Sequence, residues 1–372
     1  MKFLIVPDSF KGSLSSKEVI DIIAKELKEA FCNCTIDSYP LADGGEGSLE
    51  IIIDALGGRY VKETVKGPLF DDIESVYGIL PSGEAVIEMA KASGLTLISN
   101  ERRNAKRTST YGTGQLIDKA IKAGAKEFII GLGGSATNDC GIGMMSALGA
   151  KFYDEEGKEV KPIGENLIRI VDFDLAKFSE KIKGCSFKVM CDIINPLLGD
   201  KGATYTFGPQ KSATKEELDL LEEGMHHFKE LAFSKLKIDK SEFPGTGAAG
   251  GMGYAFCEFF GGKLESGINT IIKLYNLEQK VKEADIVISG EGCADSQSAD
   301  GKVLSGLGKI CKDNNKNLIA IVGKMSKGAE RLYDLGVSKI YPCVSEDTDT
   351  EAAIKNAKAN LISTTKKVIN QL

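Results

Sequence analysis

The chain has 372 residues, of which 42% are hydrophobic and 27% charged, and its formal net charge is −6. The acidic balance argues against nucleic-acid binding, which usually needs a basic face. No apolar run approaches the ~20 residues of a membrane-spanning helix, so we expect no membrane association. Because one hydrophobic core rarely serves more than about 250–300 residues, we expect two domains.

The counts of glycine, cysteine and histidine further limit the kinds of site that the chain can form. The chain has 42 glycines but only nine prolines. Many glycines without many prolines indicate loops whose backbone comes close to a ligand, and they do not indicate a disordered chain. The nine cysteines are odd in number and form no C-x-x-C pair, and the apolar run after Lys2 is too short for a signal peptide. We therefore expect a reduced, cytoplasmic protein. His226 and His227 are adjacent and face different directions on a helix, so any general base is expected to be a carboxylate.

Short apolar runs with the length of buried strands recur along the chain, at 3–6, 36–41, 128–132, 286–289, 318–322 and 340–344. Between the first two, Ser15 and Glu18 form a capping box that predicts the start of a helix. From about 61 to 88, apolar–polar alternation around turn residues predicts hairpins, and a further strand at 187–190 ends at Cys191-Asp192.

Strands that alternate with helical patterns predict an α/β fold with a parallel sheet covered on both faces. We assign residues 1–60, 105–150 and 280–372 to a doubly wound α/β domain. Residues 61–104 and 151–279 then form an inserted, mixed α/β domain.

Four of the predicted strands are followed by loops that combine glycine, an acid and a small hydroxyl or amide, at 7–13, 42–47, 133–139 and 290–297. Glycines let backbone N–H groups surround an anion. Carboxylates beside such loops would repel a bare phosphate, but they suit Mg²⁺, substrate hydroxyls or a transferable proton. With Lys11 and Lys302 as candidate cations, the loops predict nucleotide-dependent phosphorylation of a polyol or hydroxy acid.

Two alternatives stay open at this point. Residues 131–136 match the G-x-G-x-x-A dinucleotide pattern, with Asp154 near the ribose-binding spacing, which would suit an NAD-dependent dehydrogenase of a small hydroxy acid. That pattern leaves the acids of the other loops without a role. A non-catalytic phosphometabolite-binding protein is the other alternative. The Walker A motif is absent, since Val303 follows Gly301-Lys302.

Taken together, the loops resemble those of the bacterial glycerate kinase family. The shared blocks run in the family order over nearly the whole chain: 7–13, 42–47, 131–139, 191–192, 195–197, 207–211, 247–253 and 290–302. The resemblance implies ATP- and Mg²⁺-dependent phosphorylation of D-glycerate, with 2-phosphoglycerate favoured over 3-phosphoglycerate. It also implies a flavodoxin-like domain beside a second α/β domain, with the active site in the cleft between them. The resemblance does not decide whether the chain forms a homodimer.

The roles follow as hypotheses on these loops. Asp192, at the end of a predicted strand, is the expected general base, and Lys11 is the expected catalytic cation. Glu291 and Asp295 are expected to hold the metal. Contacts to the substrate are expected from Asp8, Ser9, Asp43, Glu46, Asn195 and Gln297. Contacts to ATP are expected from Gly133, Gly134, Ser135, Thr137, Asn138 and Lys302.

Overall fold

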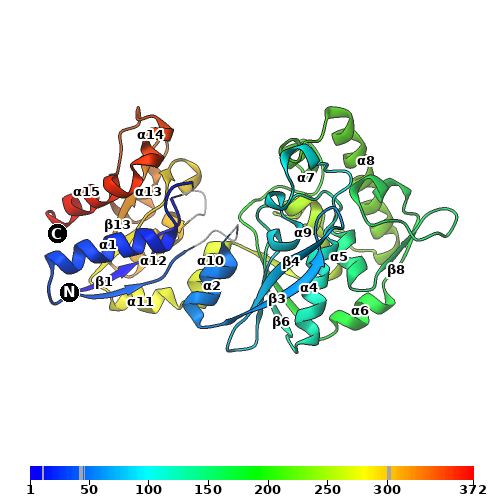
Figure 1. Cartoon of the computed structure of the whole chain (residues 1–372), viewed down its shortest axis with the longest axis horizontal. Coiled ribbons are helices and arrows are strands. Elements are labelled where there is room, and N and C mark those ends of the chain that lie inside the picture. Colours follow the sequence, from blue (N-terminus) through cyan, green and yellow to red (C-terminus); the bar gives the residue numbers. More distant parts are fainter. Residues whose placement is uncertain (11, 42–44, 46, 300–302) are drawn as a thin grey trace. The chain divides into compact units, whose positions relative to one another are not determined.

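The computed structural model describes residues 1–10, 12–41, 45, 47–299 and 303–372 (Figure 1). The chain divides into two compact units. Unit 1 consists of Met1–Asp43 and Ile268–Leu372, and unit 2 is Gly44–Gly267. None of the helices that the structure describes is long and apolar enough to cross a membrane.

Unit 1 is built on a five-stranded sheet with the order β15-β13-β11-β1-β2, in which all neighbouring strands are parallel. Its strands are β1 (Lys2–Ile5), β2 (Thr35–Ser38), β11 (Ile286–Ser289), β13 (Asn317–Val322) and β15 (Val337–Pro342), and a small sheet joins β12 (Cys293–Ala294) to β14 (Lys324–Met325). Its helices are α1 (Ser16–Ala30), α10 (Gly267–Leu274), α11 (Leu277–Glu283), α12 (Val303–Asp313), α13 (Arg331–Asp334), α14 (Thr350–Lys355) and α15 (Ala357–Ile369).

Local sequence accounts for the first elements of unit 1. Helix α1 begins at the predicted capping box, where the Ser15 side chain accepts the backbone N–H of Glu18 and the Glu18 carboxylate accepts that of Ser15. The apolar side of α1 packs with α15 against one face of the sheet, on Phe3, Ile5 and Ile288. Strand residues of the other parity, such as Leu4 and Val287, are also fully buried, so the sheet is covered on both faces.

Unit 2 contains a six-stranded sheet with the order β10-β9-β6-β5-β4-β3. Its strands are β3 (Arg59–Lys66), β4 (Asp72–Ile79), β5 (Ala85–Glu88), β6 (Glu127–Gly131), β9 (Ser186–Met190) and β10 (Lys263–Glu265). Strands β3, β4 and β5 are antiparallel, which confirms the hairpins predicted between 61 and 88, and β5, β6, β9 and β10 are parallel. A separate pair joins β7 (Lys151–Tyr153) to β8 (Asp172–Asp174).

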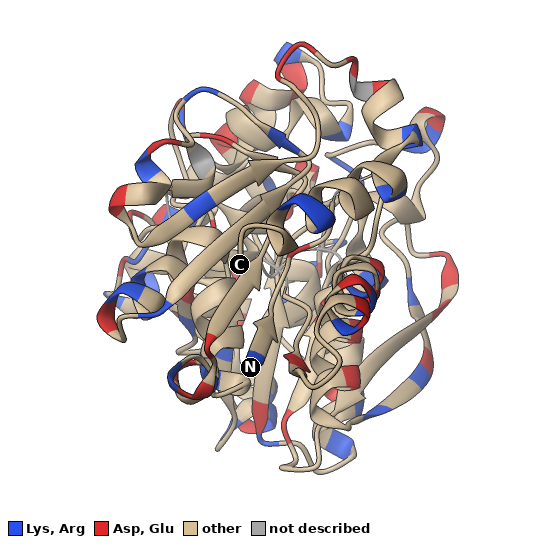
Figure 2. Cartoon of the chain, turned by 90° about the vertical axis from the view of Figure 1, so that its left-hand side faces the viewer, with Lys and Arg blue, Asp and Glu red and all other residues tan. Residues whose placement is uncertain are grey.

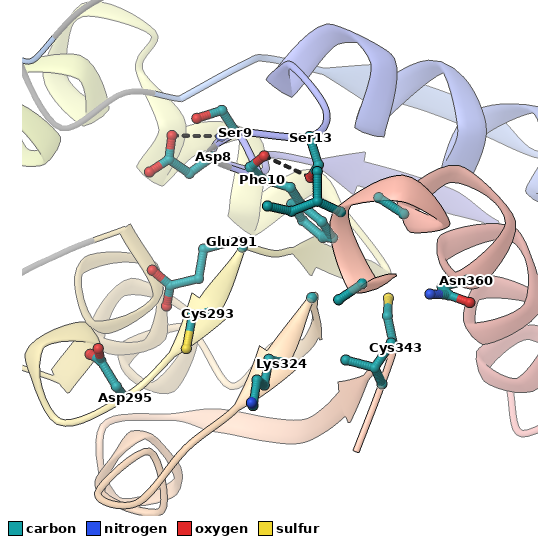
Figure 3. A pocket seen from close by; sticks show the side chains of 16 residues that line it. Asp8, Ser9, Phe10, Ser13, Glu291, Cys293, Asp295, Lys324, Cys343 and Asn360 are labelled. Carbon is teal, nitrogen blue, oxygen red and sulfur yellow. Dashed lines mark hydrogen bonds between the residues drawn. The ribbon is translucent and has the colours of Figure 1, made fainter. Parts of the chain in front are cut away.

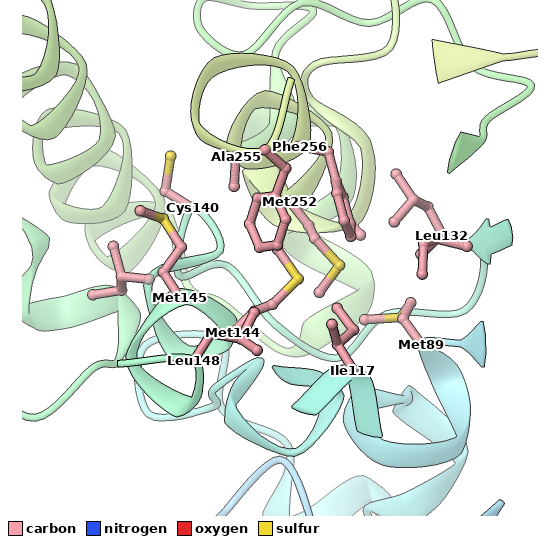
Figure 4. Close-up of a cluster of buried hydrophobic side chains, with 14 of the residues drawn as sticks. Met89, Ile117, Leu132, Cys140, Met144, Met145, Leu148, Met252, Ala255 and Phe256 are labelled. Carbon is pink, nitrogen blue, oxygen red and sulfur yellow. The ribbon is translucent and has the colours of Figure 1, made fainter. Parts of the chain in front are cut away.

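The helices of unit 2 are α2 (Ser48–Leu56), α3 (Ala90–Ser93), α4 (Tyr111–Lys122), α5 (Ile142–Ala147), α6 (Ala176–Ile182), α7 (Ala203–Phe207), α8 (Lys215–Leu236) and α9 (Ala248–Phe259). Helices α3 to α9 contribute to one hydrophobic core, in which methionines fill much of the space between α5, α9 and the sheet, whereas α2 packs on β4 and β5. Met89, Met144, Met145 and Met252 are fully buried there (Figure 4). The Met144-Met145 pair is therefore core rather than ligand contact.

The expected assignment of 105–150 to the first domain is wrong. Strand β6 lies between β5 and β9 in the six-stranded sheet, and Phe128 stacks on Phe187 with ring centroids 4.8 Å apart. Residues 44–60 also belong to unit 2, and residues 268–279 to unit 1. The reason is physical: an apolar parallel strand has the same local pattern in either sheet, and only its long-range partners decide which sheet it joins.

Charged residues of both signs are interspersed over the helices, strands and loops in the view of Figure 2. Lys2, at the start of β1, pairs with Asp37 at 3.0 Å and with Glu283 at 3.1 Å. Exposed pairs of this kind contribute at most about 1 kcal/mol each to stability.

Candidate active site

The loops that leave the carboxyl ends of β1, β11, β13 and β15 line a cavity of about 360 Å³ in unit 1 (Figure 3). Parallel strands bring these loops to one edge of the sheet, where ligands of such sheets bind. The backbone N–H of Asp8 donates to the Gly290 carbonyl at 2.8 Å, so the first and fourth predicted loops are directly joined.

Three of the predicted acids line this cavity. Asp8 and Glu291 are only 8% and 7% exposed. The Asp8 carboxylate accepts the backbone N–H of Ser9 at 2.6 Å, and the Asp295 carboxylate accepts that of Ser298 at 3.2 Å. Figure 3 shows Asp8, Glu291 and Asp295 on the same side of the cavity. The structure thus brings together Asp8, Ser9, Glu291 and Asp295.

The carboxylate oxygens of Asp8, Glu291 and Asp295 are the candidate ligands for Mg²⁺ in this cavity. Among the described residues, no group of three or more His, Cys, Asp or Glu side chains converges to hold a metal ion. Mg²⁺ in phosphoryl-transfer sites commonly takes one or two carboxylates and completes its shell with phosphate oxygens and water. Partly buried carboxylates around one cavity fit that arrangement.

Lys324, on β14, lines the same cavity and was missed in the sequence. Its Nζ donates to the Thr348 carbonyl at 3.4 Å. Its position could have identified it, because Lys324 lies two residues beyond the strand predicted at 318–322. The predicted acids likewise lie in loops that directly follow predicted strands.

In unit 2, the carboxyl ends of the parallel strands form a second sheet edge at which predicted site residues lie. Asp192 lies just after β9, is exposed, and accepts the backbone N–H of Gly267 at 3.0 Å, at the start of α10. Asn195 donates through Nδ2 to the Lys201 carbonyl at 2.7 Å. Asp192 is therefore held by a backbone hydrogen bond at the end of a strand.

The glycine loop after β6 has an exposed half and a buried half. Gly133 and Gly134 are accessible, Gly134 has a φ of 78°, and Ser135 is 9% exposed. The side chains of Thr137 and Asn138 are fully buried. Only the first half of the loop is therefore accessible, and the side chains of Thr137 and Asn138, which we expected to contact ATP, are enclosed behind it.

The buried half is fixed from behind by two charged residues. The Lys211 ammonium is 1% exposed and donates to the Thr137 carbonyl at 2.7 Å, and burial lowers the pKa of Lys211 to about 7. Fully buried Asp139 accepts the backbone N–H groups of Thr110, Gly141 and Gly143 at 2.8, 3.2 and 3.2 Å. Burial still raises the pKa of Asp139 above its ordinary value. Both residues position the loop.

Glu88 is a further acid that the sequence prediction missed. It ends β5, is 1% exposed, and its Oε2 accepts the backbone N–H groups of Gly47 and Leu49 at 3.1 and 3.3 Å. Burial raises the pKa of Glu88 to about 7, although the charge of Lys91 opposes that change. Glu88 thus anchors the first turn of α2, directly after the predicted loop at 42–47.

The dinucleotide alternative is not supported by the local structure. The fingerprint requires a helix that opens within the glycine loop, whereas α5 begins at Ile142, beyond residues 131–136. Asp154 accepts the backbone N–H groups of Glu156 and Lys158 at 3.1 and 2.9 Å, which stabilises a turn. The bond from Lys158 is the main reason that the pKa of Asp154 is lowered.

Some predicted residues cannot be placed. Lys11, Asp43, Glu46 and Lys302 lie outside the described residues. Gln297 is placed by its backbone only, in the 3₁₀ turn Gln297–Ala299.

Comparison with known proteins gives consistent matches over the full length. The model of the glycerate kinase family matches residues 3–372. A glycerate kinase of Bacillus subtilis (strain 168) is 39% identical over 96% of this chain and 94% of its own. The glycerate 2-kinase of Escherichia coli (strain K12) is 39% identical over 99% of this chain and 97% of its own. A crystal structure of a candidate glycerate kinase 2 from Salmonella typhimurium LT2 is 38% identical, with a TM-score of 0.88 over 100% of this chain and 98% of that one.

Proposed function

Because the chain belongs to the glycerate kinase family, we propose that it transfers the γ-phosphoryl group of ATP to the 2-hydroxyl of D-glycerate. Family membership makes the chain a kinase; the choice of hydroxyl is the finer proposal. The name of the Escherichia coli relative, glycerate 2-kinase, supports 2-phosphoglycerate over 3-phosphoglycerate. The observation that carries the proposal is the cavity of unit 1, where Asp8, Glu291 and Asp295 gather at the carboxyl ends of parallel strands.

We also assign the sheet of unit 1 to the flavodoxin-like folds. Counted along the chain within this sheet, the strand order is 2-1-3-4-5, and all strands are parallel. In such sheets ligands bind where the strand order reverses, which here is between β1 and β11. The loops that follow these two strands carry Asp8 and Glu291, respectively.

We propose different roles in phosphoryl transfer for the acids of the unit 1 cavity and for the glycine loop after β6. Glu291 and Asp295 are proposed to hold Mg²⁺, which would neutralise negative charge on the phosphates of ATP. The backbone N–H groups of Gly133, Gly134 and Ser135 are proposed to bind a phosphate or carboxylate anion. Lys11 and Lys302 are proposed to add positive charge at the phosphates, and Asp43, Glu46, Asn195 and Gln297 to bind glycerate.

Asp192 is proposed as the general base. As the oxygen of the substrate hydroxyl forms its bond to the γ-phosphorus, the bond to the β-phosphate oxygen breaks and the hydroxyl proton moves to the Asp192 carboxylate. The backbone N–H of Gly267 orients that carboxylate.

Replacement Asp192→Asn tests this role. The amide cannot take the proton, so we expect kcat to fall by roughly 10²–10⁴-fold, with little change in the KM for ATP. Asp200→Asn, an exposed acid on the same loop, is the matched control and should keep normal turnover. Near-normal kcat in the Asp192 variant would remove this residue from the role of base.

The activity itself is tested by ADP release from ATP and Mg²⁺ with D-glycerate present or omitted. Glycerate-dependent release is expected, and ³¹P NMR of the product should show the ester at the 2-position. Absence of glycerate-dependent ADP would refute the kinase assignment, and a 3-phosphate product would refute only the choice of hydroxyl.

A further inference from the structure

We propose that the end of the unit 1 cavity formed by Phe10, Val344, Ile354 and Ala357 binds the adenine base of the nucleotide. This inference rests on the proposed kinase function and adds to it the location and chemistry of the base subsite.

The cavity has two chemically different ends. Asp8, Glu291 and Asp295 gather on one side, whereas Cys343 and Asn360 lie on the other (Figure 3). D-Glycerate carries a hydroxyl or carboxylate on each of its three carbons, so it has no surface that apolar walls would recognise. A nucleotide has both parts: phosphates that carry a metal and a flat, largely apolar base. The two-ended cavity therefore fits a nucleotide better than glycerate.

Ile354 supports the proposal most directly. It lies on α14, lines the cavity and is 42% exposed, so a large apolar surface is available for a ligand to cover. Phe10, from the loop after β1, lines the same cavity and is only 3% exposed, so it offers a fixed wall. A cavity of about 360 Å³ lies in the size range of small-molecule sites.

Asn360, on α15, adds polar recognition at the apolar end. Its side-chain amide offers one donor group and one acceptor, the combination that pairs with the N6 amino group and N7 of adenine. Guanine presents two acceptors, O6 and N7, at the same positions, so this amide suits adenine. With the base in this cavity, Asp8 and Ser9 would contact the nucleotide and not glycerate, the ligand expected for them from the sequence.

The test uses the full chain and two variants, Ile354→Ser and Asn360→Ala. In each, we expect the KM for ATP and the Kd for ADP to rise about five- to tenfold, because apolar contact or a base hydrogen bond is lost. The KM for D-glycerate should change less than twofold. Lys358→Ala, an exposed residue of α15 outside the cavity lining, is the control and should leave all three constants unchanged.

Separate probes distinguish the base from the phosphates. Adenosine should bind more weakly to both variants, whereas inorganic tripolyphosphate should bind them as it binds the unmodified chain. Unchanged adenosine and ADP binding in both variants, with thermal unfolding curves like that of the unmodified chain, would overturn the proposal. So would a rise in the KM for glycerate alone. If the unmodified chain binds ADP, the variants lose it, and no glycerate-dependent ADP is formed, the base subsite stands and the kinase function fails.

Discussion

At the scale of single residues, burial raises the pKa of Glu88, which ends strand β5. Its carboxylate is almost fully enclosed and holds the backbone N–H groups of Gly47 and Leu49. Its pKa rises from 4.5 to about 7, so between these pH values the folded chain keeps a proton that the unfolded chain releases. By linkage, this contribution to stability is full below pH 4.5 and is lost as the pH rises through 7.

Replacement Glu88→Gln should remove that pH dependence, because the amide keeps the acceptor oxygen but does not titrate. We expect the free energy of unfolding of the unmodified chain, relative to the variant, to fall by up to about 3 kcal/mol from pH 4.5 to 7. Urea unfolding at several pH values measures the difference. Glu74→Gln, an exposed acid on neighbouring β4, should show no such trend. A difference between the unmodified chain and the Glu88 variant that stays constant with pH would contradict the prediction.

At the scale of elements, the start of α9 supports the glycine loop of unit 2. Ala249, Gly250 and Gly251 have φ values of 52°, 64° and 87°, so the chain turns left-handed there before the helix continues. This conformation brings the Gly250 carbonyl to the backbone N–H of Cys140 at 3.0 Å. A Cβ at Gly250 would overlap the Thr137 carbonyl and lie 2.6 Å from the Asn138 Cα.

Replacement Gly250→Ala should therefore destabilise unit 2 and displace the loop that carries Gly133 and Gly134. We expect a loss of about 3 kcal/mol in the free energy of unfolding, from backbone strain and steric overlap together, and a clear fall in kcat. Urea unfolding and the ADP-release assay measure the two effects.

Gly261→Ala is the matched control, since its φ is 62° and nothing lies within 4 Å of an added Cβ. It should cost only about 1–2 kcal/mol, the strain of the left-handed conformation, and leave kcat unchanged. Equal losses in the two variants would show that the contact with Thr137 is unimportant.

At the scale of the whole molecule, the two units have separate hydrophobic cores. The buried cluster of unit 2 includes Phe128, Phe187 and Phe256, whereas that of unit 1 is built from Phe3, Ile288 and Leu361. Unit 2 is one continuous segment, but the sheet of unit 1 joins strands from both ends of the chain. A continuous segment with its own core has what independent folding requires.

A fragment of residues 44–267 should consequently fold alone. We expect a cooperative thermal transition by circular dichroism and no binding of ADP, because the base subsite proposed above belongs to unit 1. A fragment of residues 1–43 should stay unfolded, since its strand β1 lacks its partner β11. A non-cooperative melt of the longer fragment, or ADP binding by it, would contradict this prediction.

The sequence by itself determined the features that depend on neighbouring residues. These are the capping box at Ser15, the apolar strands such as 286–289, and the acids at strand ends that the cavity of unit 1 later unites. Helix caps, strand periodicity and turn chemistry act within a few residues, so they can be read locally.

Only the tertiary structure decided which sheet β6 joins, which half of its loop is buried, and that Glu88 and Lys211 hold the loops in place. Thr137 and Asn138 have the composition of ligand-binding residues, yet packing against Gly250 and Lys211 encloses them. Burial and strand pairing are set by residues far away along the chain, and for that reason a local pattern cannot specify them.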